Sequence, residues 1–196
     1  MRRSSRILIA IAALSLGLLY WFPLWHISLH APQYPEGLGL YIGMNQIRGQ
    51  NPNDLNSING LNHYIGMKPI HPDDIPELKI MPWVVRGLIL FGLLVAALNR
   101  RWLLNLWVGA FVLLAGVGLW DFWRWEYDYG HNLDPHAAIK VPGMSYQPPL
   151  LGSKQMLNIN ASSWPAAGGW VAIGVVTLAI VIMVLEMKRA RAGAAA

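Results

Sequence analysis

Histidine and methionine side chains recur at even spacing in one stretch of the sequence. His63, Met67 and His71 follow one another at intervals of four residues in the stretch NGLNHYIGMKPIH. Imidazole and thioether groups suit Cu(I) in a chain that, like this one, has no cysteine. Gly66 and Pro69 disfavour a continuous helix here, so a loop would have to hold the three donors. Spacing alone leaves two interpretations open, half of a copper site and ordinary hydrogen-bonded loop residues.

A second group of the same side chains lies later in the chain, where Pro135 stiffens the backbone beside His136. A complete site would need donors from both segments, with Met44 as a further thioether. The candidate copper ligands are therefore His63, Met67, His71, His131, His136 and Met144.

Motifs that carry catalysis are missing from the sequence. It contains no glycine-rich phosphate loop, no CxxC, no HExxH and no GxSxG. The acidic group Asp73, Asp74 and Glu77 is interpreted as capping and solvated surface. We therefore expect no enzymatic activity, no catalytic residue and no organic cofactor.

The composition is that of a membrane protein. Hydrophobic residues make up 55% of the 196-residue chain and charged residues only 13%. Four apolar runs approach the ~20 residues that a helix needs to cross ~30 Å of hydrocarbon. They cover residues 7–25, 82–98, 102–120 and 168–187. The sequence predicts an all-α fold in which residues 1–196 form one membrane domain with four transmembrane helices. A cleaved signal peptide is the alternative for the first run, but bulky residues at its end disfavour cleavage.

Charged residues predict the orientation of these helices. Basic residues tend to stay on the cytoplasmic side of short membrane segments. They cluster at both termini and at Arg100 and Arg101, whereas all six histidines lie in or beside the two long connecting segments. We expect both termini in the cytoplasm and both long segments in the periplasm. The basic residues behind the net charge of +5 are then explained by the orientation of the helices, and we expect no nucleic-acid partner.

The two exported segments, residues 26–81 and 121–167, are expected to form a small, mostly irregular cap. They are too apolar for disorder but rich in turn residues. Residues 31–42 are expected to be extended and to end in a short strand, and a short helix is expected to start near Asn53 or Asp54. The third membrane helix should continue to about residue 129 as a stalk, with Gly130 as its C-cap.

Several phrases together resemble a known family. They are PLWHISLHAPQYPEGL, INGLNHYIGMKPIHPDDIPELKI and DFWRWEYDYGHNLDPHAAIKVPGMSYQPPLLGSKQ, set among four membrane helices. The set resembles NosB, a family of small bacterial membrane proteins encoded beside nitrous-oxide reductase, in the Sec-dependent branch of that system. The resemblance covers roughly residues 20–165. It implies a multi-pass protein of the bacterial inner membrane that supports periplasmic nitrous-oxide reduction in denitrification.

Two functions follow as hypotheses. In the first, the protein is an accessory factor that handles copper or docks the multicopper reductase or its copper-delivery proteins. In the second, it is a non-catalytic anchor or scaffold in a quinol-to-periplasm electron-transfer complex, bound to electron-transfer membrane subunits. The lipid bilayer is a partner in both.

Overall fold

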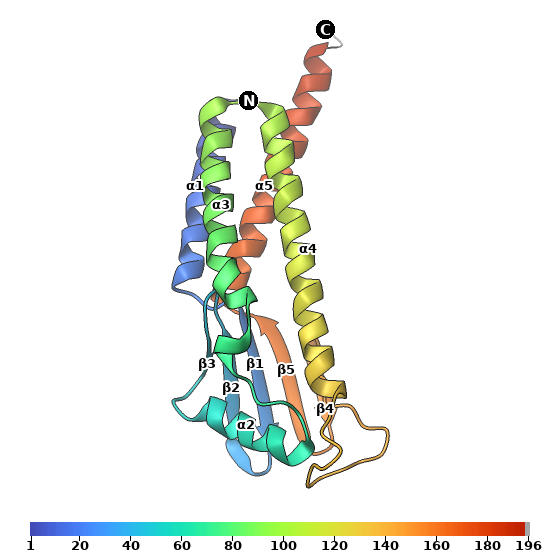
Figure 1. Cartoon of the computed structure of the whole chain (residues 1–196). Coiled ribbons are helices and arrows are strands. Elements are labelled where there is room, and N and C mark those ends of the chain that lie inside the picture. Colours follow the sequence, from blue (N-terminus) through green and yellow to red (C-terminus); the bar gives the residue numbers. More distant parts are fainter. Residues whose placement is uncertain (195–196) are drawn as a thin grey trace.

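The computed structural model describes residues 1–194 and divides into a helical bundle and a sheet domain at one end of it (Figure 1). The two chain ends lie at the opposite end of the bundle (Figure 1). Apolar helices and a β-sheet thus occupy separate regions along the long axis of the molecule.

The bundle contains four helical segments. They are α1 (Arg3–Ser15) with its 3₁₀ continuation η1 (Leu16–Tyr20), α3 (Glu77–Leu98), α4 (Arg101–His131) and α5 (Ala167–Ala194). Within the described residues, four helices are long and apolar enough to cross a membrane, which indicates a membrane protein. The prediction of four such helices is confirmed.

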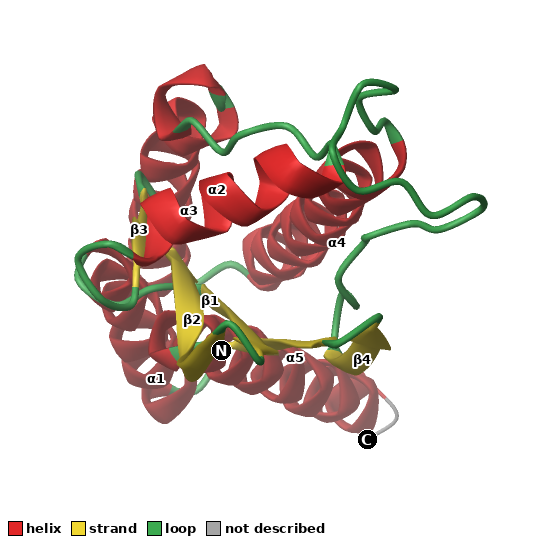
Figure 2. Cartoon of the chain, turned by 90° about the horizontal axis from the view of Figure 1, so that it is seen from below, coloured by secondary structure: helices red, strands yellow, loops and turns green. Residues whose placement is uncertain are grey.

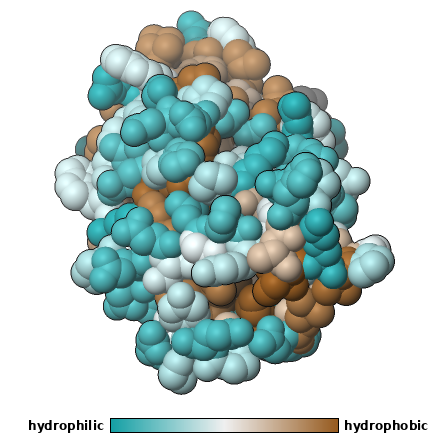
Figure 3. Space-filling model, turned by 60° about the horizontal axis from the view of Figure 1, so that its bottom comes forward, coloured by the Kyte–Doolittle hydropathy of each residue, from teal (hydrophilic) through white to brown (hydrophobic). Residues whose placement is uncertain are grey.

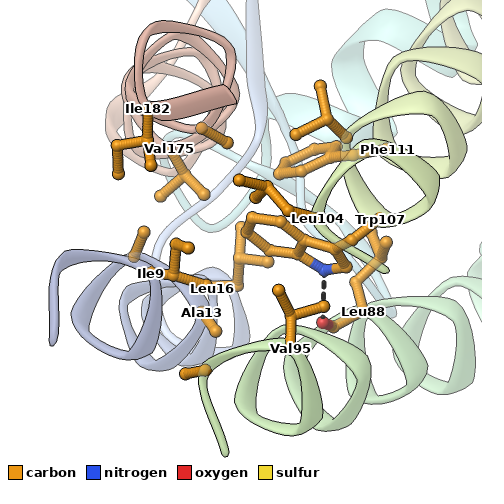
Figure 4. Packing of buried hydrophobic residues seen from close by; sticks show 14 of the residues in the cluster. Ile9, Ala13, Leu16, Leu88, Val95, Leu104, Trp107, Phe111, Val175 and Ile182 are labelled. Atoms are coloured by element: carbon orange, nitrogen blue, oxygen red, sulfur yellow. Dashed lines mark hydrogen bonds between the residues drawn. The ribbon is translucent and has the colours of Figure 1, made fainter. Parts of the chain in front are cut away.

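Aromatic and small side chains fit together in the bundle core (Figure 4). The Trp107 indole of α4 is fully buried and donates a 2.9 Å hydrogen bond to the Leu88 carbonyl of α3. Gly92 leaves room for this ring, because a Cβ there would lie 2.7 Å from Ala13 Cβ and 2.9 Å from Trp107. Close packing of this kind, rather than water exclusion, holds helices together in lipid.

A buried carboxylate ties the bundle together near the chain ends. Glu186 of α5 is 2% exposed, and its Oε1 accepts hydrogen bonds from Ser5 Oγ at 2.7 Å and Arg2 N at 3.1 Å. Arg189 Nη1 lies 3.2 Å from the same oxygen, and Arg101 Nε lies 3.6 Å from Oε2. One side chain therefore connects α1, α4 and α5.

A five-stranded antiparallel sheet makes the expected all-α fold wrong. Its strands are β1 (Trp25–Ala31), β2 (Tyr34–Ile42), β3 (Ile47–Gly49), β4 (Gly152–Met156) and β5 (Ile159–Pro165). They lie in the order β3-β2-β1-β5-β4, so β1 joins two hairpins that are far apart in the sequence. The expected mostly irregular cap is corrected as well, although residues 132–151 contain neither helix nor strand.

Alternation of side chains gives the sheet two faces. On β1, Ile27 and Leu29 belong to a hydrophobic cluster, while His26 and Ser28 point to the other side. The cluster is covered by α2 (Asp54–Ile65) and by the sheet end of α4, which lie on one side of the sheet (Figure 2). We call the covered side the core face and the other the open face.

A buried aspartate holds α2 against the sheet. Asp54 Oδ2 accepts hydrogen bonds from the backbone N–H groups of Gly39 in β2, at 2.9 Å, and Asn51, at 3.0 Å. Its position in the first turn also complements the helix dipole. The expected helix start at Asn53 or Asp54 is confirmed. A 3₁₀ turn, η2 (Pro72–Asp74), then leads toward α3.

Two expected helix ends differ in the structure. The first helix was expected to reach residue 25, but it ends at Tyr20, and Trp25 begins β1. Gly130 lies inside α4 rather than capping it, because α4 continues to His131. A side chain at Gly130 would collide with the backbone of Gln147, so this glycine allows residues 146–147 to pack on the helix.

The turn between β2 and β3 connects the sheet domain to the bundle. Met44 in this turn is 1% exposed and belongs to the bundle's hydrophobic core. Leu24 N donates to the Ile42 carbonyl and Gly168 N to the Pro23 carbonyl, both at 2.8 Å. The β2–β3 turn therefore lies at the level where the helices meet the sheet.

Candidate docking site at the sheet end of α4

The first group of predicted copper donors lies at the end of α2. His63 is in the last turn of this helix, exposed, with its ring edge-on to Tyr64 at a centroid distance of 6.1 Å. Gly66, with a φ of 81°, ends the helix, so the expectation that no continuous helix runs from His63 to His71 is confirmed. Met67 and His71 follow in the extended connection to η2, so the three donors do not share a helix face.

The two long connecting segments meet at this point, as a shared site would require. Asp134 N donates to the Gly66 carbonyl at 2.8 Å, and Ile139 N donates to the Tyr64 carbonyl at 2.9 Å. Gly66 is needed here, because a Cβ would lie 2.9 Å from Ala137 Cβ. The contacts are between backbones, and they place residues 64–66 beside residues 134–139.

The remaining donors take separate partners. The His131 ring stacks on Tyr127 at 3.9 Å, and its Nδ1 lies 3.0 Å from the Tyr127 carbonyl oxygen. His136 is 90% exposed and lies 3.3 Å from Asp134. His71 is exposed, Met144 is half-buried, and Met44 is in the bundle core.

Among residues 1–194, no group of three or more His, Cys, Asp or Glu side chains is placed to hold a metal ion. That statement does not cover groups that include methionine. The copper site therefore stays a prediction.

An ion pair fastens the connection after α2 to α4. Lys68 Nζ donates to Asp128 Oδ2 at 2.7 Å, and this hydrogen bond lowers the pKa of the Asp128 carboxyl. Tyr129 Oη also donates to the Pro69 carbonyl at 3.4 Å. Both partners of the ion pair are about half exposed, so the pair orients the segment more than it stabilises the fold.

Exposed aromatic rings follow one face of α4 as it enters the sheet domain. Trp123 and Tyr127 lie one turn apart with centroids at 5.5 Å, and His131 continues the stack one turn further. Trp120 precedes them at similar helical spacing and is covered by the Arg124 guanidinium at 5.7 Å. We call Trp120, Trp123, Tyr127 and His131 the aromatic row.

The aromatic row reaches further than a membrane interface does. The apolar part of α4 ends at Trp120, after about 28 Å of helix from Trp102. Tyr127 and His131 lie about 10 and 16 Å beyond Trp120 along the axis. The headgroup layer adds only about 5–7 Å on each side. An interfacial belt therefore explains Trp120 and Trp123 but not the two outer rings.

The end of the molecule that carries the sheet domain is largely hydrophilic (Figure 3). Hydrophilic residues cover most of the face that Figure 3 brings forward, the end of the molecule opposite the termini. Tyr127 is nevertheless 45% exposed and Trp123 42% exposed. Aromatic groups bounded by polar residues are the usual centre of a protein–protein contact.

No family model matches this chain. No curated protein matches it significantly either.

An acid on the other side of α4 is buried, which the sequence did not lead us to expect. Glu126 is fully buried, and neither carboxylate oxygen has a hydrogen-bond partner among the described residues. It lies beyond the apolar part of α4, and burial raises its pKa to about 8. The available signal was spacing, since Glu126 lies one turn from both Phe122 and Gly130, which face the sheet and Gln147.

Proposed function

We propose that this protein is an accessory protein of the bacterial inner membrane that docks a partner protein on the periplasmic side, in support of nitrous-oxide reduction. The observation that carries docking is the aromatic row, whose outer rings stand exposed beyond headgroup depth. The pathway rests on the resemblance of residues 20–165 to NosB. The partner we propose is nitrous-oxide reductase or one of its copper-delivery proteins.

Charge supports the orientation that this function needs. Arg2, Arg3 and Arg6 precede α1, Arg100 and Arg101 occupy the α3–α4 turn, and basic residues follow Glu186. All of these lie at the end of the molecule that carries the termini (Figure 1). The positive-inside rule places that end in the cytoplasm and the aromatic row in the periplasm.

Rigid mounting supports docking rather than a flexible tether. The row lies on a single uninterrupted helix, and Phe122, Trp125 and Tyr129 of that helix pack into the sheet core. A partner bound to the row would be held at a fixed height above the bilayer. Because the row is already rigid, binding would order few side chains and loops, and the entropy cost that lowers affinity would be small.

Alanine substitution of the row should weaken capture of the reductase. We expect Trp123→Ala with Tyr127→Ala to raise the Kd about tenfold or more, as loss of central aromatic contacts does. The measurement is binding of purified reductase, and separately of its copper carriers, to the protein in lipid nanodiscs. Trp170→Ala is the matched control, because Trp170 is 58% exposed but lies at the start of α5, on a different helix from the row.

The same experiment tests the alternative function. Equal affinity of the double variant and the wild type would contradict docking through the row. Capture of cytochrome or iron–sulfur subunits from a mild-detergent extract, without the reductase or its carriers, would instead favour the anchor in a quinol-to-periplasm complex.

Copper handling is a second proposal, favoured by the contact between residues 64–66 and 134–139. That contact brings the segments of His63, Met67 and His136 to one end of the sheet domain. Cu(I) titration of the detergent-purified protein should show binding that a His63→Ala, His71→Ala variant loses at least tenfold. Equal and weak binding by both proteins would remove the metal role.

A further inference from the structure

Four side chains form a row across the open face of the sheet. Cross-strand pairing places Arg48 beside Tyr41, Tyr41 beside His26, and His26 beside Trp164. These residues come from β3, β2, β1 and β5, so the row spans four adjacent strands. We call it the open-face row, and its nearest neighbour on the same face is a polar row that includes Ser28 and Ser162.

Contacts between the side chains hold the open-face row in place. The His26 ring stacks on Tyr41 at a centroid distance of 4.5 Å, and Arg48 Cζ lies 5.8 Å from the Tyr41 ring centre. Gln50 crosses over Gly39, and its Oε1 lies 2.9 Å from His26 Nε2. Only a glycine at position 39 leaves this space for Gln50. The arrangement is therefore built before any ligand arrives.

The open-face row lies close to the membrane surface. Trp25, Ile42 and Pro165 are paired at the bundle end of the strands, and the row is one residue, about 3.3 Å, further along. Met44 in the adjoining turn is inside the bundle core. The row thus lies at headgroup depth.

A small hollow lies beside Arg48 at the bundle end of the sheet. It is lined by residues 19–23 at the end of η1, by residues 43–46 in the β2–β3 turn, and by Arg48. Trp21 is 76% exposed and Phe22 46% exposed at this edge. Tryptophan and other aromatic groups at this depth favour contact with the glycerol region of lipids.

Arg48 offers an unused positive charge at this place. The salt bridges and side-chain hydrogen bonds of the described chain involve other residues and leave the exposed Arg48 guanidinium without an acceptor. A guanidinium binds phosphate oxygens through two parallel N–H donors, which an ammonium group does not. Its free donors, its place at headgroup depth and the aromatic edge beside it call for an anionic amphiphile.

We propose that Arg48 and the open-face row bind the phosphate of an anionic phospholipid of the phosphatidylglycerol class. The Arg48 guanidinium donates hydrogen bonds to the phosphate oxygens. Tyr41, backed by His26, positions the guanidinium. Trp21 and Phe22 contact the upper part of an acyl chain. A bilayer lipid is the occupant because the row lies next to the bundle end of the strands, beside the exposed Trp21 and Phe22. The bound lipid would fix the height of the sheet domain above the membrane.

Native mass spectrometry of the detergent-purified protein with added lipid tests this site. We expect wild-type protein to retain phosphatidylglycerol about fivefold more strongly than phosphatidylcholine, the effect of about one basic residue at an anionic surface. Arg48→Ala should abolish that preference, and Arg48→Lys should keep part of it. Arg124→Ala is the matched control, since Arg124 is also an exposed arginine over an aromatic ring, on the α4 side.

Each other result would overturn the proposal. An equal loss of the phosphatidylglycerol preference in Arg48→Ala and Arg124→Ala would show that the preference comes from general surface charge and not from this site. Retained preference in Arg48→Ala, at an unchanged thermal midpoint, would place the lipid elsewhere. Displacement of the lipid by millimolar inorganic phosphate would identify a free-anion site, whereas persistence of the lipid supports the headgroup site.

Discussion

The wild-type protein should become less stable as the pH rises from about 5 to about 8.5, and the Glu126→Gln variant should lose much less stability. Burial raises the pKa of Glu126 to about 8, against an ordinary value of 4.5. Between these values the unfolded chain releases the proton while the folded protein keeps it, so unfolding becomes easier as pH increases. The expected loss is roughly 3–5 kcal/mol over this window.

Thermal unfolding in one detergent at a series of pH values measures this effect. The thermal midpoint of the wild type should fall by roughly 10 °C more than that of Glu126→Gln. The difference between the two pH dependences reports on Glu126 alone, because every other titrating group is present in both proteins. Parallel curves for the two proteins would show that Glu126 is ionised or hydrated in the folded state.

Glu186→Ala should lower the free energy of unfolding by roughly 2–4 kcal/mol. The substitution removes the acceptor for Ser5 Oγ and Arg2 N and leaves Arg101 and Arg189 without their buried partner. The connection between α1, α4 and α5 would then depend on packing alone. Thermal unfolding in detergent, together with limited proteolysis near the chain ends, measures the loss.

Two further variants serve as controls for the Glu186→Ala prediction. Glu186→Gln keeps one acceptor oxygen and should fall between the wild type and Glu186→Ala. Glu36→Ala, at an exposed acid in β2, should change stability by less than about 0.5 kcal/mol. An unchanged midpoint for Glu186→Ala would mean that the carboxylate does not hold the helices together.

Hydrophobic run length made the bundle predictable from sequence. A lipid environment leaves few structures for an apolar run of about 20 residues, so the four helices follow almost directly. The start of α2 at Asp54 and its end at Gly66 were also predictable, because both depend on local backbone chemistry.

The sheet was much harder to predict because its evidence is not local. The stretch from Tyr34 to Ile42 alternates clearly only toward its end, and β5 contains Asn160 and three serine or proline positions that resemble a loop. Pairing of β1 with β5 across more than a hundred residues supplies what the short strands lack. Such pairing leaves almost no signal in one sequence.

The candidate site was predictable in part for the same reason. Trp120, Trp123 and Tyr127 are spaced by three and four residues, and the helical period alone places them on one helix face. The positions of the four histidines relative to one another depend on how the ends of α2 and α4 and two connecting segments meet, and such contacts leave no periodic pattern in the sequence. They are His63, His71, His131 and His136. Glu126 and the open-face row required knowledge of the sheet.

The order of strands also constrains how the molecule is made. β1, β2 and β3 leave the ribosome long before β5, and α3 and α4 must cross the bilayer in between. Until then β1 presents an unpaired edge, which is a template for aggregation. A nascent chain stalled after α4 should therefore need protection by a chaperone on the sheet-domain side of the membrane, until β4 and β5 are made and complete the sheet.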